Sequence, residues 1–192
     1  LNTDNLPALV VCPASVKYNW AKECRAWLPD MTVEALEGRK GVIPDADIII
    51  CNYDIISGRK DSLLDYGFNI VVCDESHYLK NIKAKRTAST LEVASESESV
   101  ICLSGTAVTN RPSEFFTTLN LLRPNEFPSF FPYGQRYCDG QNNGWGWDFS
   151  GASNTDELHA RTRDFCIRRL TQEGLTELPD KVRTIMDIQP SA

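Results

Sequence analysis

The sequence of 192 residues contains no apolar run near the roughly 20 residues that a membrane-spanning helix needs. Residues 1–6 carry neither a basic start nor an apolar signal core, so we expect no export signal. Hydrophobic residues make up 42% and charged residues 24% of the chain, which is typical of soluble globular domains. We therefore expect an intracellular protein without a membrane partner, nuclear in a eukaryote and cytoplasmic in a bacterium or virus.

Metal-binding cysteine patterns are also lacking. The seven cysteines include no C-x-x-C pair, and the chain has two histidines to complete a site. Soft-metal sites need clustered ligands at short spacings. Four of the cysteines end or interrupt apolar runs, so buried thiols in a reducing compartment explain them better than a metal site or disulfides.

The chain has no excess of positive charge, since its net charge is −6. A protein that coats nucleic acid needs clustered lysine and arginine to neutralise phosphates. Such contacts must therefore come from local clusters. These are Lys80, Lys83, Lys85 and Arg86 in one stretch, and Arg168, Arg169, Lys181 and Arg183 in another. From composition alone, a solvated helix face explains either cluster equally well.

Four short runs rich in valine and isoleucine predict buried parallel strands. They are residues 9–12, 48–51, 70–73 and 100–103. A helix over residues 16–28 would begin behind Ser15 as its N-cap. Its apolar face would include Trp20 and Trp27. Helical patterns around Leu63 and before the fourth run complete the alternation, which predicts an α/β fold with a doubly wound parallel sheet.

Beyond Thr106 the pattern changes. Residues 113–122 predict a helix, and the aromatic, proline- and glycine-rich stretch 124–153 predicts an insertion that is part helical and part irregular. A capping pattern after this stretch indicates another helix. The length fits a single domain, so we expect residues 1–181 to form one lobe and residues 182–192 to begin a linker.

Chemistry is expected beyond the carboxyl ends of the strands, where ligands gather in open α/β sheets. The third run ends in two adjacent carboxylates, Asp74 and Glu75. An aspartate there can hold a nucleotide-bound Mg²⁺, and a neighbouring glutamate can orient and deprotonate the water that attacks the γ-phosphate. The pair predicts a Walker B site. Two surface acids are the alternative, but the four β-forming residues before the pair and Ser76-His77 after it favour the site.

Polar groups also follow the fourth run. They are Ser104, Gly105 and Thr106. Their two hydroxyl groups lie on a neighbouring strand tip, within plausible reach of the imidazole of His77. A surface histidine and an ordinary Ser-Gly-Thr turn are the simpler alternatives for these two features.

Several motifs, in order along the chain, resemble those of the SWI/SNF-type superfamily-two DNA-dependent ATPases. They are residues 12–16 with Trp20 (motif Ia), 52–54 (motif Ib), 74–77 (the DExH box) and 103–107 (Leu-(Thr/Ser)-Gly-Thr-Pro). Residues 136–139 and 145–151 resemble a narrower group within this family, the annealing-helicase branch (HARP-type, SMARCA-like). Similarity runs over residues 9–188, nearly the whole chain.

The resemblance implies a RecA-like lobe that uses ATP with Mg²⁺ to move on duplex or forked DNA and to anneal or remodel it. It implies that Asp74 serves the Mg²⁺ and Glu75 the attacking water. It also implies that His77, Ser104 and Thr106 couple hydrolysis to the grip on DNA. Short polar groups and helix starts contact phosphates without reading sequence. The implied DNA-binding residues are Ser15 and Lys17 beside a helix start, Asn52 and Tyr53 on a loop, and Lys80, Arg168 and Arg169.

The phosphate-binding pattern G-x-x-x-x-G-K-[ST] is missing from the sequence. In the family this loop precedes the strand that begins here at Leu9, so we interpret its absence as truncation of a longer protein. The strand of that loop would lie beside run 100–103, so Val100 and Leu103 should lie at an exposed edge that could pair with another chain. The second RecA-like lobe, which would carry an arginine finger, is missing too. We expect the chain alone to hydrolyse no ATP.

Two other functions fit part of the pattern. A non-catalytic DNA-docking or scaffold lobe could keep the fold and lose ATP binding, although intact Asp74, Glu75 and His77 argue against it. A kinase or metabolic P-loop enzyme could share the Walker B pair, but it would not explain Ser-Gly-Thr at 104–106 or the paired arginines at 168–169.

Overall fold

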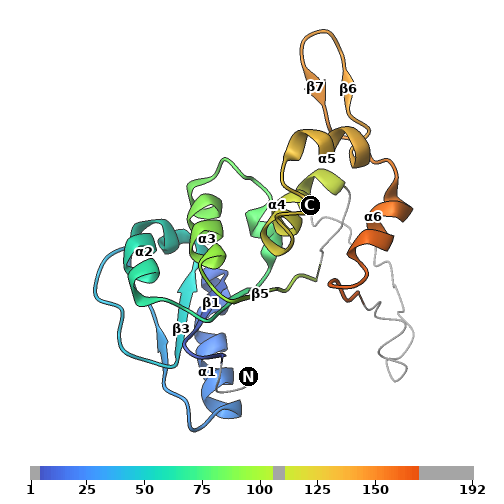
Figure 1. Ribbon diagram of the computed structural model, residues 1–192. Coiled ribbons are helices and arrows are strands. Elements are labelled where there is room, and N and C mark those ends of the chain that lie inside the picture. Colours follow the sequence, from blue (N-terminus) through green and yellow to red (C-terminus); the bar gives the residue numbers. More distant parts are fainter. Residues whose placement is uncertain (1–4, 106–110, 169–192) are drawn as a thin grey trace, which may run out of the picture. The chain divides into compact units, whose positions relative to one another are not determined.

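The computed structural model describes residues 5–105 and 111–168 (Figure 1). Residues 1–155 form one compact unit and residues 156–192 form a second. The predicted lobe boundary at residue 181 lies outside the described residues. So do four of the residues named above, which are Thr106, Arg169, Lys181 and Arg183.

The first unit is built on a sheet of five parallel strands in the order β2-β3-β1-β4-β5. The strands are β1 (Ala8–Cys12), β2 (Val33–Ala35), β3 (Ile48–Asn52), β4 (Ile70–Cys73) and β5 (Ser99–Cys102). The predicted α/β fold with a parallel sheet is confirmed. The sequence pattern missed β2, because a buried Val33 followed by an exposed Glu34 is too short to form a recognisable run.

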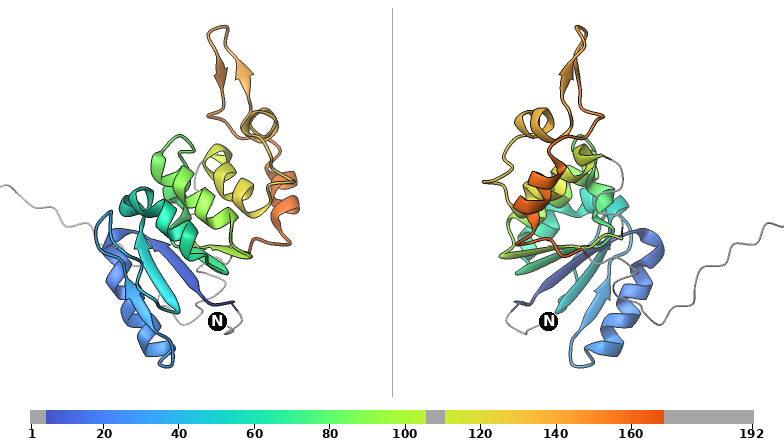
Figure 2. Two further views of the ribbon diagram at one scale, coloured as in Figure 1. Left: turned by 60° about the vertical axis from the view of Figure 1, so that its left-hand side comes forward. Right: turned by 90° about the vertical axis from the view of Figure 1, so that its right-hand side faces the viewer.

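Helices cover both faces of the sheet, as a doubly wound fold requires (Figure 2). On one face, Leu9 belongs to a core with residues of α2 (Tyr53–Tyr66) and α3 (Lys85–Ser95). On the other face, Val10 belongs to a core with residues of α1 (Lys17–Trp27). Strands buried on both faces need apolar residues at every position, which explains why the central strands read as continuous apolar runs.

β5 lies at the edge of the sheet. It spans Ser99–Cys102 rather than residues 100–103, and among the described residues its one strand neighbour is β4. The side chains of Ile101 and Leu103 are exposed there. The expected open edge is therefore present in the described part of the chain, and its pairing with another chain stays a prediction.

The start of α1 differs from the prediction. Ser15 is not an N-cap but lies inside a 3₁₀ turn, Ala14–Val16, and α1 begins at Lys17 with no side-chain cap. The buried positions of the helix are Lys17, Ala21 and Cys24. Trp27, predicted to face inward, is 79% exposed. Trp20 and Leu28 pack against the core as predicted, while the first turn also buries Lys17, whose long stem lets its ammonium donate to the Leu36 carbonyl at 2.8 Å.

α2 is longer than its sequence pattern indicated. The apolar spacing around Leu63 predicted a short helix, whereas the helix begins at Tyr53, directly after β3. Asn52 and Tyr53 therefore lie at a strand end and in a first helical turn, not on a loop. Gly58 hid the first half of the helix from the pattern. A Cβ atom there would lie 2.8 Å from the carbonyl oxygen of Arg39, so the close approach of that loop requires glycine.

Arg59 on α2 fastens the loop that follows β2. The residue is 5% exposed, and its guanidinium donates to the carbonyls of Gly38 at 2.8 Å, Lys40 at 2.8 Å and Gly41 at 3.1 Å. It also donates to the carbonyl of Glu37. The hydrogen bonds of this one side chain thus hold a loop that has no regular secondary structure.

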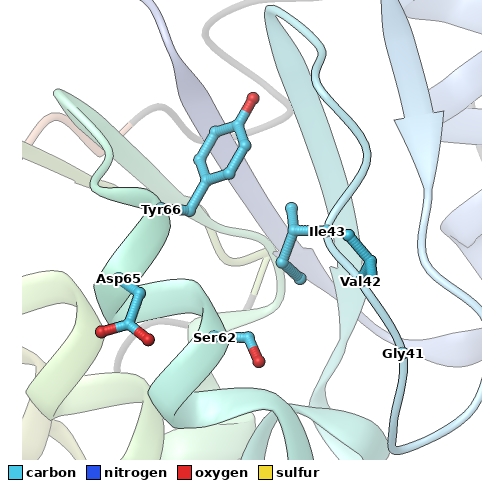
Figure 3. A pocket seen from close by; sticks show the side chains of 6 residues that line it. All are labelled: Gly41, Val42, Ile43, Ser62, Asp65 and Tyr66. Atoms are coloured by element: carbon cyan, nitrogen blue, oxygen red, sulfur yellow. The ribbon is translucent and has the colours of Figure 1, made fainter.

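Tyr66 holds the far end of the same loop. Its hydroxyl donates to the Ala46 carbonyl at 2.8 Å and accepts the Ala46 N–H at 3.0 Å. Figure 3 shows the open hollow of about 490 Å³ that lies between the loop and α2. Its lining residues are Gly41, Val42, Ile43, Ser62, Asp65 and Tyr66.

The stretch 124–153 is part helical and part irregular, as predicted. Its elements and their neighbours are α4 (Pro112–Leu122), α5 (Phe130–Tyr137), the antiparallel strands β6 (Gln141–Asn142) and β7 (Trp147–Asp148), and α6 (Thr155–Thr162). Leu158 and Thr162 are the buried residues of α6, as its spacing predicted.

Within residues 5–105 and 111–168, no helix has the length and apolar character to cross a membrane.

All seven cysteines are free thiols, and five of them are buried. Burial is the largest cause that raises the pKa of Cys12 and of Cys51 to about 12. A hydrogen bond with Cys102 on the neighbouring strand, followed by burial, raises the pKa of Cys73. These three thiols stay protonated and poorly reactive at neutral pH.

Replacing Arg59 by methionine is expected to lower the free energy of unfolding by about 2 kcal/mol, because four loop carbonyls lose a charged donor. Arg59→Lys should recover part of the loss, since one ammonium cannot reproduce the planar fork. Urea titration followed by circular dichroism measures both. Arg39→Met in the exposed loop is the control and should change stability by less than about 0.5 kcal/mol; equal effects of Arg39→Met and Arg59→Met would contradict the assignment.

Candidate active site

Asp74 and Glu75 lie directly beyond the carboxyl end of β4, next to the centre of the sheet. The Asp74 N–H donates to the Val11 carbonyl of β1 at 2.8 Å, and the Ser76 N–H donates to the Leu103 carbonyl beyond β5 at 2.8 Å. The backbone of the acidic motif is therefore tied to the strands on both sides of β4, which fixes where its side chains start.

The carboxylate of Asp74 is oriented by two N–H donors. Its Oδ1 accepts the backbone N–H of Glu75 at 2.9 Å, and its Oδ2 accepts the indole N–H of Trp20 at 2.8 Å. Trp20 is half-buried on α1 and also packs against the core beneath that helix. Sequence analysis placed Trp20 in the core and missed the polar contact. The available signal was chemical, because a buried indole N–H needs an acceptor.

Tyr53 holds the same residue from the other face of the sheet. Its hydroxyl donates to the main-chain carbonyl of Asp74 at 2.8 Å, and the side chain is 1% exposed. Burial is the largest cause that raises the pKa of Tyr53. Its ring stacks on Tyr78 with centroids 5.3 Å apart, and the guanidinium of Arg86 lies 5.5 Å from the Tyr78 centroid. Tyr53 thus supports the acidic motif from inside the fold.

Glu75 has a left-handed backbone, with φ 49° and ψ 52°. This conformation is costly for a residue with a side chain and occurs preferentially at functional sites. Its Oε2 lies 3.1 Å from Nδ1 of His77, close enough for an ion pair. Among the described residues Oε2 accepts no hydrogen bond, and the atom is buried.

His77 connects the tips of β4 and β5. It lies in a short 3₁₀ helix, Ser76–Leu79, and its Nδ1 is 3.4 Å from Oγ of Ser104. The predicted proximity of the imidazole to the serine is therefore present. Gly105 follows in a turn, and Thr106 lies outside the described residues.

The predicted DNA-binding residues that the structure describes differ in exposure and in their partners. Ser15 and Lys80 are exposed, and Lys80 is paired with Glu114 at 3.4 Å. Asn52 is buried at the end of β3, with its amide nitrogen 3.5 Å from Oδ2 of Asp54. Arg168 is also exposed, in the second unit.

Lys17 departs furthest from its predicted role. Its ammonium is buried, where it donates to the Leu36 carbonyl and lies 3.1 Å from the carboxylate of Glu37. A phosphate contact would require the ammonium to leave both partners. In this structure Lys17 instead secures α1 to the segment after β2.

The acidic motif fits a hydrated Mg²⁺ ion. Mg²⁺ prefers oxygen ligands, keeps several waters and takes one or two protein carboxylates beside nucleotide phosphates. Each oxygen of Asp74 accepts one N–H and retains a lone pair for a water or a cation. In the part of the chain that the structure describes, no group of three His, Cys, Asp or Glu side chains could hold a metal, so phosphate and water would supply the other ligands.

Comparison with known proteins identifies the family. A family model described as the SNF2-related domain matches residues 2–192. The chain belongs to the SNF2-related family. Its relatives include a SWI/SNF-related matrix-associated actin-dependent regulator of chromatin subfamily A-like protein 1 of Xenopus laevis, 37% identical over 190 residues and 96% of this chain. They also include the DNA annealing helicase and endonuclease ZRANB3 of Mus musculus, 34% identical over 201 residues and 97% of this chain.

A solved structure supports the same assignment. The Sulfolobus solfataricus SWI2/SNF2 ATPase core in complex with dsDNA matches 95% of this chain with a TM-score of 0.74 and 26% identity, over 38% of its own length. The fold with its parallel sheet thus matches the RecA-like lobe of a SWI2/SNF2 ATPase core. The SNF2-related chain spans about one fifth of the length of the two curated relatives.

A double-mutant cycle tests the bond between Trp20 and Asp74. Stabilities of Trp20→Phe, Asp74→Ala and the double variant should give a coupling energy of about 1.5–3 kcal/mol, the usual range for a hydrogen bond to a charged group. The exposed pair Trp27 and Glu23 on the same helix, 3.0 Å apart, is the matched control and should couple by less than about 0.5 kcal/mol. Equal coupling energies in the two cycles would show that the bond between Trp20 and Asp74 stabilises the fold no more than an exposed hydrogen bond does.

Proposed function

We propose that the chain is the first motor lobe of a DNA-stimulated ATPase that moves on duplex or forked DNA and anneals or remodels it. The observation that carries this proposal is the arrangement beyond β4, where Asp74 is held by two donors and Glu75 has a left-handed backbone. The names of the relatives, an annealing helicase and a chromatin regulator, and the DNA-bound ATPase core agree with it.

Each residue of the acidic motif has a separate task in the proposed reaction. Asp74 would hold the Mg²⁺ ion, which would neutralise charge on the nucleotide phosphates. Trp20 keeps the Asp74 carboxylate in one orientation. Glu75 accepts a proton from the attacking water through its carboxylate. The imidazole of His77, 3.1 Å away, compensates the charge of Glu75 when protonated.

Coupling to DNA is proposed to pass through the tip of β5. His77 contacts both Glu75 and Ser104, so a movement of the segment after β5 would change the surroundings of the hydrolytic oxygen. Thr106 would take part from the same segment. Phosphate contacts are assigned to Ser15, Asn52, Lys80, Arg168 and Arg169.

The full-length protein would complete the ATP site. A phosphate-binding loop would supply the grip on the β- and γ-phosphates, and a second RecA-like lobe would supply an arginine finger. The open edge of β5 is available for an additional strand. We place the protein inside the cell, in the nucleus if its source is a eukaryote.

A non-catalytic docking lobe is less well supported. A scaffold gains nothing from a glutamate in a left-handed conformation, which costs on the order of 1–3 kcal/mol. It also has no need for the two donors that orient Asp74. Both features serve hydrolysis, so we favour the motor.

Glu75→Gln in the full-length protein is expected to lower DNA-stimulated ATP turnover at least about 100-fold, because glutamine cannot accept the proton. ATP affinity should stay within about threefold, since no phosphate contact is lost. Phosphate release and fluorescent-nucleotide binding measure the two effects. Glu92→Gln alters an exposed carboxylate on α3 that is paired with Lys60 of α2; this variant is the control and should keep turnover. A Glu75→Gln protein with normal turnover would rule out the assigned role.

The purified 192-residue chain is expected to release no phosphate from ATP, with or without duplex DNA, because its sequence contains no phosphate-binding loop. A sensitive phosphate assay at high protein concentration checks this. DNA-stimulated release that disappears in the same chain carrying Glu75→Gln would contradict the expectation and point to another phosphate grip.

A further inference from the structure

The hairpin formed by β6 and β7 carries an unusually exposed tryptophan. Figures 1 and 2 show the hairpin extending beyond α5, away from the five-stranded sheet. Trp145 lies in its turn and is 99% exposed. Tryptophan buries more apolar surface than most side chains when it has a partner, so a fully exposed tryptophan in an ordered turn is a candidate contact for another molecule.

The base of the hairpin is fixed to α5 by aromatic rings. Trp147 meets Phe131 of α5 edge to face at 5.0 Å and stacks on Phe149 at 6.0 Å. Phe149 also lies against Gly134 and Gly140, where a Cβ atom would approach its ring to 2.7 Å. Because the Phe149 ring fills the space that a side chain at position 134 or 140 would need, the base of the hairpin is held in one orientation against α5.

The turn itself is held by hydrogen bonds. Oδ1 of Asn142 accepts the Gly144 N–H at 2.9 Å, and Oδ1 of Asn143 accepts the Trp145 N–H at 3.0 Å. The Asn143 N–H donates to the Gly146 carbonyl at 3.0 Å. These bonds reduce the entropy that Trp145 would lose on binding.

Both faces of the indole are accessible. The neighbours of Trp145 are Gly144 and Gly146, and a Cβ atom at either position would meet nothing within 4 Å. No side chain of these neighbours shields the ring. The arrangement is a flat aromatic platform on a narrow, braced support.

We propose that Trp145 stacks on an unpaired nucleobase at a junction between duplex and single-stranded DNA. Stacking on aromatic side chains is the general way in which proteins bind unpaired bases, because every base has a π-face. The inference rests on the proposed function, since a motor that anneals DNA meets such a junction.

The composition of the tip favours a base over a protein surface. Residues 141–146 are glutamine, two asparagines, two glycines and Trp145, so the tip has no second apolar side chain. An anchor residue in a protein interface is normally surrounded by further contacts that exclude water. The same residues carry no charge, so the tip has no cation to attract the phosphate backbone, and the face of the indole is the feature that a base would contact.

The test compares full-length wild type and Trp145→Ala on two DNA probes. One probe is a fork with 2-aminopurine at the first unpaired position, and the other is a blunt duplex of equal length. Loss of stacking should weaken fork binding about tenfold and leave duplex binding unchanged. The dependence of fork affinity on salt should keep its slope, because no phosphate contact is removed. Wild type should quench 2-aminopurine, and Trp145→Ala should not.

Two further variants make the result specific. Trp145→Phe should retain part of the fork affinity, since it keeps an aromatic face. Trp27→Ala removes another exposed tryptophan, on α1, and should bind both probes like wild type. Unchanged stability of Trp145→Ala in urea would confirm that the loss is one of binding.

Several outcomes would overturn the inference. Equal fork affinity of wild type and Trp145→Ala, or equal losses on fork and duplex, excludes a base contact. If Trp145→Ala instead abolishes self-association measured by sedimentation, the hairpin is a protein contact. When wild type shows DNA-stimulated turnover in any of these cases, the proposed function stands and the hairpin assignment alone fails. A full-length protein that binds neither probe overturns both.

Discussion

The orientation of one carboxylate, that of Asp74, brings the separate layers of the lobe together. Its oxygens accept N–H groups from Trp20 on α1 and from the backbone of Glu75, while its main-chain carbonyl accepts the hydroxyl of Tyr53 on α2. α1 and α2 cover opposite faces of the sheet. Both helices must therefore be seated correctly before the carboxylate is oriented, and the buried contacts of Lys17 and Arg59 secure each helix to the segment around β2. The Asp74 carboxylate is therefore oriented only when the sheet and both helices have folded.

The fold was predictable because its central strands are buried on both faces, and such strands must be continuous apolar runs. β4 was located to the residue, and the carboxylates beyond it followed from the rule that ligands gather at the ends of parallel strands. β2 was not predictable, because a strand of three residues at a sheet edge needs few apolar positions. The same reason explains why the boundaries of β5, the other edge strand, were shifted.

Contacts within the candidate site were predictable between residues that are close in the sequence. Contacts between residues that are far apart in the sequence were missed. Glu75 and His77 are two residues apart, so their proximity follows from the motif. Trp20 and Asp74 are far apart in the chain, and the apolar character of tryptophan hid its N–H. The family resemblance assigned Lys17, beside a helix start, and Tyr53, on an expected loop, to DNA contacts. Both are buried here, because their polar ends find partners inside the fold.

The left-handed backbone of Glu75 has a consequence for how such lobes diverge. Glycine or asparagine would adopt the same φ with less strain. Under the proposed role of Glu75, a descendant that no longer hydrolyses ATP would gain stability by exchanging the glutamate for either residue, whereas an active lineage would have to keep it. Stability and turnover would then favour different residues at position 75.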